Sequence, residues 1–295
     1  MRWRFPLAVM LAGGVLLPAS APAAPQTFNT ALPLSKGQFV LREQFFLREI
    51  SGRTAGMERD LQVTGLASVL GYGVNADWAI FGVVPWQRKE LDSGPIDRST
   101  SGFGDASVFA RYTVFQHNAP GRTLRVAPFA GFKTPTGATG ESDSRGRLPR
   151  PLQPGTGAWD GFGGVVVTWQ TLAWELDGQI RYQATGSDDG FEVGNRFDFD
   201  ASWQYRVWPR ELGSGVQGFG YAVLESNLQV QDNSRVDGMR DPDSGGTRWF
   251  LSPGLQWVTR SWIVEAIVQL PVTQNLDGEQ PKDDFILRAG FRINF

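Results

Sequence analysis

The chain contains no cysteine and a single histidine among its 295 residues. Without thiols it forms neither disulfide bonds nor thiolate metal sites, and one histidine gives no basis for a transition-metal cluster. His117 is predicted to lie in a short solvated turn, whereas a hydrolase would need such a base beside a serine on a strand. We therefore expect no cofactor, no metal site and no enzymatic activity.

Long apolar runs and a dominant charge are also missing. Beyond the first 24 residues no run approaches the ~20 apolar residues of a transmembrane helix. The formal net charge is -2 and the mean hydropathy is -0.24. A nucleic-acid-binding protein would concentrate basic residues on one face, so no nucleic-acid partner is expected. The low hydropathy does not exclude a membrane barrel, because only alternate residues of its strands face lipid.

The first residues have the three-part layout of a secretory signal peptide. Arg2 and Arg4 form a basic start, residues 7–17 are apolar, and Ala21 and Ala23 form the small-residue pair before a cleavage site. We predict cleavage after Ala23. Residues 24–35 would then form a short periplasmic tail, and residues 36–295 a single outer-membrane barrel domain.

The end of the chain carries the clearest strand pattern. Every odd position in 285–295 is apolar, whereas charged residues such as Asp284, Arg288 and Arg292 occupy even positions. Because a strand presents alternate side chains to opposite faces, one face is apolar and the other is charged. A chain ending on such a strand, with Phe295 last, resembles the terminal strand of bacterial outer-membrane barrels. Outer-membrane lipid and the barrel-assembly machinery, acting through this strand, are the expected partners.

A two-residue alternation recurs in further segments. Residues 172–183 and 195–208 sustain it beyond the ~5–6 residues of an ordinary strand, and outer-membrane strands need ~9–11. The segments 77–88 and 216–229 do not decide which face points to lipid. The remaining strands are predicted at 38–49, 59–71, 104–115, 123–134, 159–169, 247–258 and 261–270. With the C-terminal strand, this predicts an all-β fold: an antiparallel up-and-down transmembrane barrel of about twelve strands.

The predicted connections alternate in length. Short turns fall at 73–76, 117–122, 170–171, 209–215 and 259–260. Longer connections, most of them rich in Gly, Pro and Asp, fall at 50–58, 87–102, 135–158, 185–194, 230–246 and 271–283. Short periplasmic turns and long extracellular loops are typical of outer-membrane barrels.

If the apolar phases face lipid, the charged phases line the lumen. The predicted pore-lining or mouth residues are Asp105, Arg111, Arg125, Lys133, Asp160, Asp177, Arg181, Asp198, Asp200 and Arg206. Both signs are interspersed, so no strong ion selectivity is expected. These charges form a salt-bridge network that holds the interior together, a polar ladder that guides a small solute, or both. Twelve strands lie between filled eight-stranded and open sixteen-stranded barrels, so the lumen should be narrow, gated or partly filled.

Three stretches carry a family likeness: Gly102-Phe-Gly-Asp105, Pro128 to Gly137, and Leu148 to Asp160. In this order they resemble the outer-membrane family associated with the meta-cleavage pathway of phenol degradation, described as transporters. The resemblance implies a bacterial outer-membrane barrel that passes small, poorly soluble, aromatic compounds.

The same stretches are predicted to meet at one place. Asp105 begins one descending strand, Lys133 ends the ascending neighbour, and Asp160 begins the next descending strand. We expect Lys133, between two carboxylates, to fix the loop 135–158 over the mouth of the barrel. The alternative is a purely architectural rim with no solute contact.

The leading hypothesis for function is an outer-membrane channel for passive uptake of small hydrophobic or aromatic compounds. The alternative is a structural or surface-interaction barrel with a filled lumen. A lipid-modifying outer-membrane enzyme is a third hypothesis, which the lone His117 disfavours.

Overall fold

The computed structural model describes residues 23–54, 57–94, 96–210 and 215–295, so the signal-peptide prediction for residues 1–23 lies almost wholly outside the described residues. The long strands are β1 Phe39–Thr54, β2 Met57–Gly73, β3 Trp78–Asp92, β7 Arg122–Lys133, β10 Asp160–Thr171, β11 Trp174–Ala184, β14 Arg196–Trp208, β15 Gly218–Gln231, β18 Gly246–Thr259, β19 Trp262–Leu276 and β20 Lys282–Asn294. The shorter elements are β4 Asp97–Phe103, β5 Ser107–Tyr112, β6 Phe115–Ala119, β8 Ser142–Asp143, β9 Gly146–Arg147, the 3-10 helix η1 Arg150–Leu152, β12 Ser187–Asp188, β13 Phe191–Glu192, β16 Arg235–Val236 and β17 Met239–Arg240.

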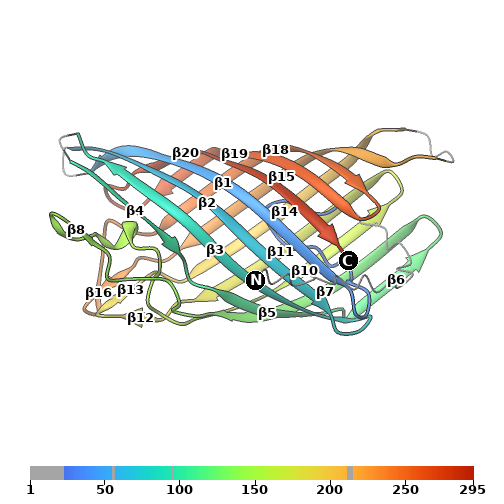
Figure 1. The fold of residues 1–295 in the computed structure, drawn as a ribbon, viewed down its shortest axis with the longest axis horizontal. Helices are drawn as coiled ribbons and strands as arrows, with labels where there is room; N and C mark the ends of the chain where they lie inside the picture. Colours follow the sequence, from blue (N-terminus) through green and yellow to red (C-terminus); the bar gives the residue numbers. More distant parts are fainter. Residues whose placement is uncertain (1–22, 55–56, 95, 211–214) are drawn as a thin grey trace, which may run out of the picture.

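The long strands form one closed antiparallel barrel. Each except β3 pairs with the next long strand along the chain, and β20 returns to pair with β1, so that the sheet has no free end (Figure 1). β4, β5 and β6 follow one another in a single position between β3 and β7. The barrel therefore has twelve strand positions, which confirms the predicted fold. No described residue belongs to a helix long and apolar enough to cross a membrane.

The outer surface of the barrel is apolar. Phe291 and Trp203, on the predicted lipid-facing phases, are 43% and 49% exposed. Aromatic rings gather near the end that carries the short turns: Phe39 packs 4.8 Å from Tyr72 and 5.6 Å from Phe295, between ring centroids. A belt of this kind matches the interfacial aromatic girdle of outer-membrane barrels.

The two ends of the barrel differ as predicted, but several expected loops are strands. Short turns join the strands at one end, here called the inner end, and long connections lie at the other, the outer end (Figure 1). The predicted loops 50–58 and 87–102 are largely extensions of the β1–β2 and β3–β4 hairpins. Two further long connections supply β12, β13, β16 and β17, which form a separate four-stranded sheet. Residues of these two connections therefore pair with one another in a sheet that is separate from the barrel sheet.

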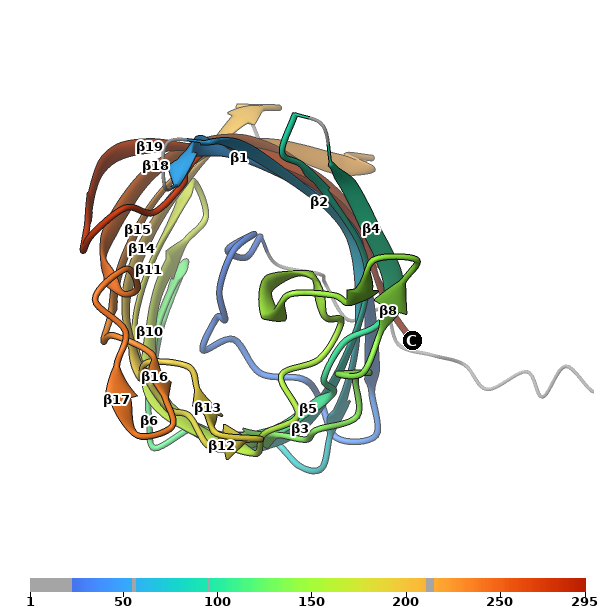
Figure 2. The same ribbon diagram turned by 90° about the vertical axis from the view of Figure 1, so that its left-hand side faces the viewer.

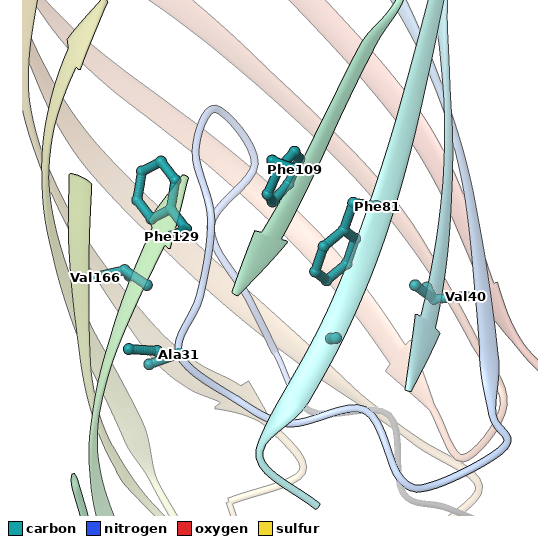
Figure 3. Packing of buried hydrophobic residues seen from close by; sticks show 8 residues of the cluster. Ala31, Val40, Phe81, Phe109, Phe129 and Val166 are labelled. Atoms are coloured by element: carbon teal, nitrogen blue, oxygen red, sulfur yellow. The ribbon is translucent and has the colours of Figure 1, made fainter. Parts of the chain in front are cut away.

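The lumen is not lined by polar residues throughout. Phe81, Phe109 and Phe129 point inward from β3, β5 and β7 and are buried with Val166 and Ala31 (Figure 3). The Phe81 and Phe109 rings stack with their centroids 4.8 Å apart. This apolar patch departs from the expectation of a charged lining, and its cause is local. Around Phe81 both phases of β3 are apolar, so alternation alone does not reveal its inner face, whereas Phe109 lies on the same phase of β5 as Arg111 and interrupts a lining that is otherwise polar.

Residues 23–35 lie inside the barrel and not in a periplasmic tail. Figure 2 shows this segment crossing the space within the ring of strands. Ala24, Gln26 and Ala31 are at most 2% exposed. The expected tail was wrong because the segment satisfies its backbone polar groups against lumen side chains, as buried backbone must.

Candidate functional site: the barrel lumen

The N-terminal segment, residues 23–35, is held mainly by hydrogen bonds to the barrel wall. Glu225, buried on β15, accepts hydrogen bonds from the backbone N–H of Gln26 at 2.6 Å and of Thr27 at 3.1 Å, and from the Thr27 hydroxyl. The Gln26 carbonyl accepts from Arg42 at 2.5 Å and Gln44 at 2.9 Å. One carboxylate and several amide and guanidinium groups thus hold an irregular chain in the lumen.

Further along, the segment is fixed on the other side of the barrel. Arg111 donates to the carbonyl oxygens of Thr30 and, at 2.5 Å, Leu32. The Thr168 hydroxyl accepts from the Ala31 N–H at 2.8 Å and lies 3.1 Å from the Thr30 hydroxyl. The segment therefore spans the lumen from β15 and β18 to β5 and β10.

The N-terminal segment runs between two cavities of the lumen, an outer cavity lined by residues such as Lys89 and Pro151 and an inner cavity lined by residues such as Ser35 and Thr123. The outer cavity has a volume of about 550 Å³ and the inner cavity about 360 Å³. Phe28 lines both. The segment thus occupies the path that would connect the two cavities.

The mouth of the barrel is organised around Lys133. Its ammonium lies 3.1 Å from Asp105 and 3.0 Å from Asp160, and the two carboxylates are only 4% and 5% exposed. The register of β7 and β10 places Lys133 directly opposite Asp160. The three residues predicted to meet at the rim are therefore in contact.

Asp105 also binds both ends of the loop 135–158. It accepts from the Gly137 N–H at 2.9 Å, the Thr156 N–H at 2.8 Å and the Thr156 hydroxyl at 2.7 Å. Burial opposes its ionisation, but the hydrogen bonds from Thr156, Gly137 and Lys133 prevail and lower the pKa of Asp105. Asp105 is thus a charged acceptor at neutral pH that ties the two loop ends together.

The loop itself is compact and reaches toward the lumen. A Cβ atom on Gly155 would lie 2.4 Å from the Gly137 carbonyl oxygen, so the two loop ends approach too closely for any other residue at that position. From the wall, Lys89 donates to the carbonyl oxygens of Pro151 at 2.9 Å and Gln153 at 2.7 Å. Pro151 lines the outer cavity, and Figure 2 shows the loop within the mouth.

The other predicted pore-lining residues also lie on the inner face of the barrel. Arg181 pairs with Asp198 at 3.2 Å, and Asp200 accepts from Asn227 at 2.9 Å. Asp177 accepts from Thr168 and from Gln204. Arg125 donates to Gln116 and lines the inner cavity, and Arg206 donates to the Arg210 carbonyl. Most of these contacts are within the wall.

Several residues that shape the lumen were absent from the predicted set. Glu225, Gln256 and Gln26 fix the N-terminal segment, with Gln256 donating to the Ala24 carbonyl at 2.5 Å. Glu225 lies in the segment 216–229, whose facing the sequence leaves open. Gln256 lies on the polar face of the predicted strand 247–258, and this alternation could have identified it as a luminal residue.

The geometry defines a class, the outer-membrane β-barrels, with a lumen narrowed by an inserted segment and an infolded loop. Within this class, residues 51–269 match the model of the family "Putative MetA-pathway of phenol degradation". The chain belongs to that family. The family identified from the three sequence stretches is thereby confirmed.

Solved structures resemble the chain in fold. An outer-membrane channel of Pseudomonas putida F1 superposes with a TM-score of 0.69 at 14% identity, covering 93% of this chain and 100% of that one. The β-domain of the Bordetella autotransporter BrkA gives a TM-score of 0.48 at 14% identity, over 88% and 100% of the two chains. The CymD monoaromatic hydrocarbon channel gives 0.40 at 8% identity, over 89% of each. No curated protein matches the sequence.

Proposed function

We propose that the chain is an outer-membrane channel for passive uptake of small hydrophobic or aromatic compounds. The observation that carries the proposal is the division of the lumen into an apolar and a polar side. Phe81, Phe109 and Phe129 belong to a buried apolar patch, whereas β11, β14 and β15 present buried carboxylates and amides. A poorly soluble ring can pass along the apolar side, while water and polar groups share the other. The family's association with phenol degradation supports the same solute class.

Flux through this channel requires the N-terminal segment to move. It lies between the two cavities, and its polar contacts to the wall are hydrogen bonds, whose donors and acceptors can be satisfied by water when the segment moves. Passage, and not catalysis, is the role that we assign to the lumen.

An engineered disulfide tests this proposal, because the chain has no native cysteine. In a variant with Thr30→Cys and Thr168→Cys, oxidation would tie the segment to β10, since the two hydroxyl oxygens lie 3.1 Å apart. Full-length barrel in liposomes is assayed for entry of a small aromatic solute with the variant oxidised and reduced. We expect flux that falls on oxidation and returns with reductant. Each single-cysteine variant is the control and should not respond.

The same assay addresses the alternative of a structural or surface-interaction barrel. The inserted segment, which fills part of the lumen, is the observation that favours it. Absence of flux in the wild type, and in the variant in both redox states, would contradict the channel and leave the filled barrel.

We also infer that residues 1–23 are an export signal and that the barrel-assembly machinery recognises the strand ending at Phe295. Cleavage after Ala23 would place the new terminus at Ala24, which contacts Gln256 within the lumen. Intact-mass measurement of the protein from outer membranes tests the cleavage site. A mature mass beginning elsewhere would overturn it.

A further inference from the structure

The outer cavity has two unlike walls. Phe46 and Ile50 from β1, Leu61 and Val63 from β2, and Ile286 from β20 supply an apolar wall. The remaining wall is built mainly from β11, β14 and β15 and carries charged and amide groups such as Asp198 and Asn227. A solute that matches both walls must be apolar on one side and polar on the other.

The arginines near this cavity differ in whether a carboxylate balances their positive charge. Arg48 pairs with Asp283, and Arg181 and Arg196 both pair with Asp198 at 3.2 and 3.1 Å. Arg288 differs from them. Among the residues that the structure describes it forms no ion pair, and it donates hydrogen bonds to the neutral amide oxygens of Gln269 at 2.8 Å and Gln44 at 3.2 Å.

Arg288 also lies next to the apolar wall. Its guanidinium carbon is 5.9 Å from the centre of the Phe46 ring, and both residues line the cavity together with Ile286. A guanidinium group has five N–H donors in a planar fork that matches a carboxylate. A partly buried cation without an opposing charge favours an anionic ligand, since the ligand would supply the missing charge.

We propose that the outer cavity binds a monocyclic aromatic carboxylate, with the ring against Phe46 and Ile286 and the carboxylate on Arg288. The volume of about 550 Å³ lies within the ~300–1,000 Å³ of small-ligand sites. The role of this site in uptake rests on the proposed channel function, but binding itself does not require flux.

Titration calorimetry on the purified full-length barrel in detergent tests the site with three probes. Phenylacetate has both ring and charge, phenylacetamide keeps the ring without the charge, and acetate keeps the charge without the ring. We expect phenylacetate to bind at least tenfold more tightly than either analogue. Equal binding of phenylacetate and phenylacetamide would overturn the proposal.

Two variants locate the site. Arg288→Gln should remove the preference for phenylacetate over phenylacetamide, and Arg288→Lys should restore part of it. Arg122→Gln, an exposed arginine on the opposite rim, is the matched control and should bind as wild type. Equal losses in Arg288→Gln and Arg122→Gln would contradict the assignment. If Arg288→Gln fails to fold, Phe46→Ala takes its place and should weaken phenylacetate binding, and unchanged binding would contradict the ring site.

Binding and flux separate the two proposals. Flux without selective phenylacetate binding would leave the channel and remove this site. Selective binding without flux for any aromatic solute would leave this site and remove the channel.

Discussion

Two segments enter the lumen from opposite ends, and different interactions hold them. The loop 135–158 at the outer end is fastened at both of its ends by the ion-paired cluster of Asp105, Lys133 and Asp160. The N-terminal segment, at the inner end, is continuous with the barrel only at β1 and depends on hydrogen bonds to Glu225 and Arg111. A loop that buried ion pairs hold at both ends is expected to narrow the lumen permanently. A segment that is joined to the barrel at one end and held by hydrogen bonds is expected to act as a movable plug.

The largest expected effect comes from Lys133→Met. Removing one member of a buried ion pair leaves uncompensated charge and costs about 3–5 kcal/mol, and here two buried carboxylates would be left facing each other. We expect release of the loop while the barrel still forms, seen as rapid proteolysis within 135–158 and raised single-channel conductance.

A matched control for Lys133→Met is Arg147→Met. Arg147 pairs with Asp189, and the two side chains are 53% and 67% exposed. Exposed pairs contribute at most about 1 kcal/mol, so proteolysis and conductance should change little. Equal behaviour of the two variants would contradict the claim that the Lys133 cluster holds the loop.

Glu225→Gln is expected to have the next largest effect, on the other segment. Hydrogen bonds to a charged group contribute about 1.5–3 kcal/mol, and the amide replaces one strong acceptor oxygen by a donor. The N-terminal segment should then leave the lumen more often. In the background of Thr30→Cys and Thr168→Cys, the yield of the disulfide should fall. Glu58→Gln, at an exposed hairpin position, should leave the yield unchanged, and an unchanged yield in Glu225→Gln would contradict the role of Glu225.

A third prediction concerns acid. Because the pKa of Asp105 is lowered in the fold, its stabilising effect is complete above the unfolded value of about 3.9 and is lost as the pH falls through the lowered pKa. Protease cleavage within 135–158 should therefore be constant between about pH 7 and pH 5 and should rise only below about pH 4. Asp105→Asn should abolish this acid step. A rise already present near pH 6 would show that another group controls the loop.

The fold and the mouth cluster could be predicted because both follow from local pattern. The two-residue period in 285–295 and 195–208 gives strands directly, and strand direction then brings Asp105, Lys133 and Asp160 to one rim. The N-terminal segment has no such period. Its contact between Gln26 and Glu225 joins residues 199 positions apart, so nothing near either residue announces it. The luminal ring of Phe81 was missed because β3 is apolar on both faces around it. Phe109 shares its phase with Arg111, and only charged members of that phase entered the predicted lining.

The smallest expected effect comes from the tip of the loop 135–158, at residues 142–147. Arg98 on β4 donates to Asp143 at 2.7 and 2.8 Å and to the Gly146 carbonyl at 2.9 Å, and the hydrogen bond from Arg98 is the main reason that the pKa of Asp143 is lowered. Arg98→Ala removes hydrogen bonds to the loop tip that are separate from the buried cluster of Asp105, Lys133 and Asp160. We expect faster amide exchange confined to residues 142–147, with conductance and proteolysis of the remaining loop unchanged. Exchange spreading to Gly137 and Thr156 would mean that the tip, and not Lys133 with its two carboxylates, keeps the loop folded into the mouth.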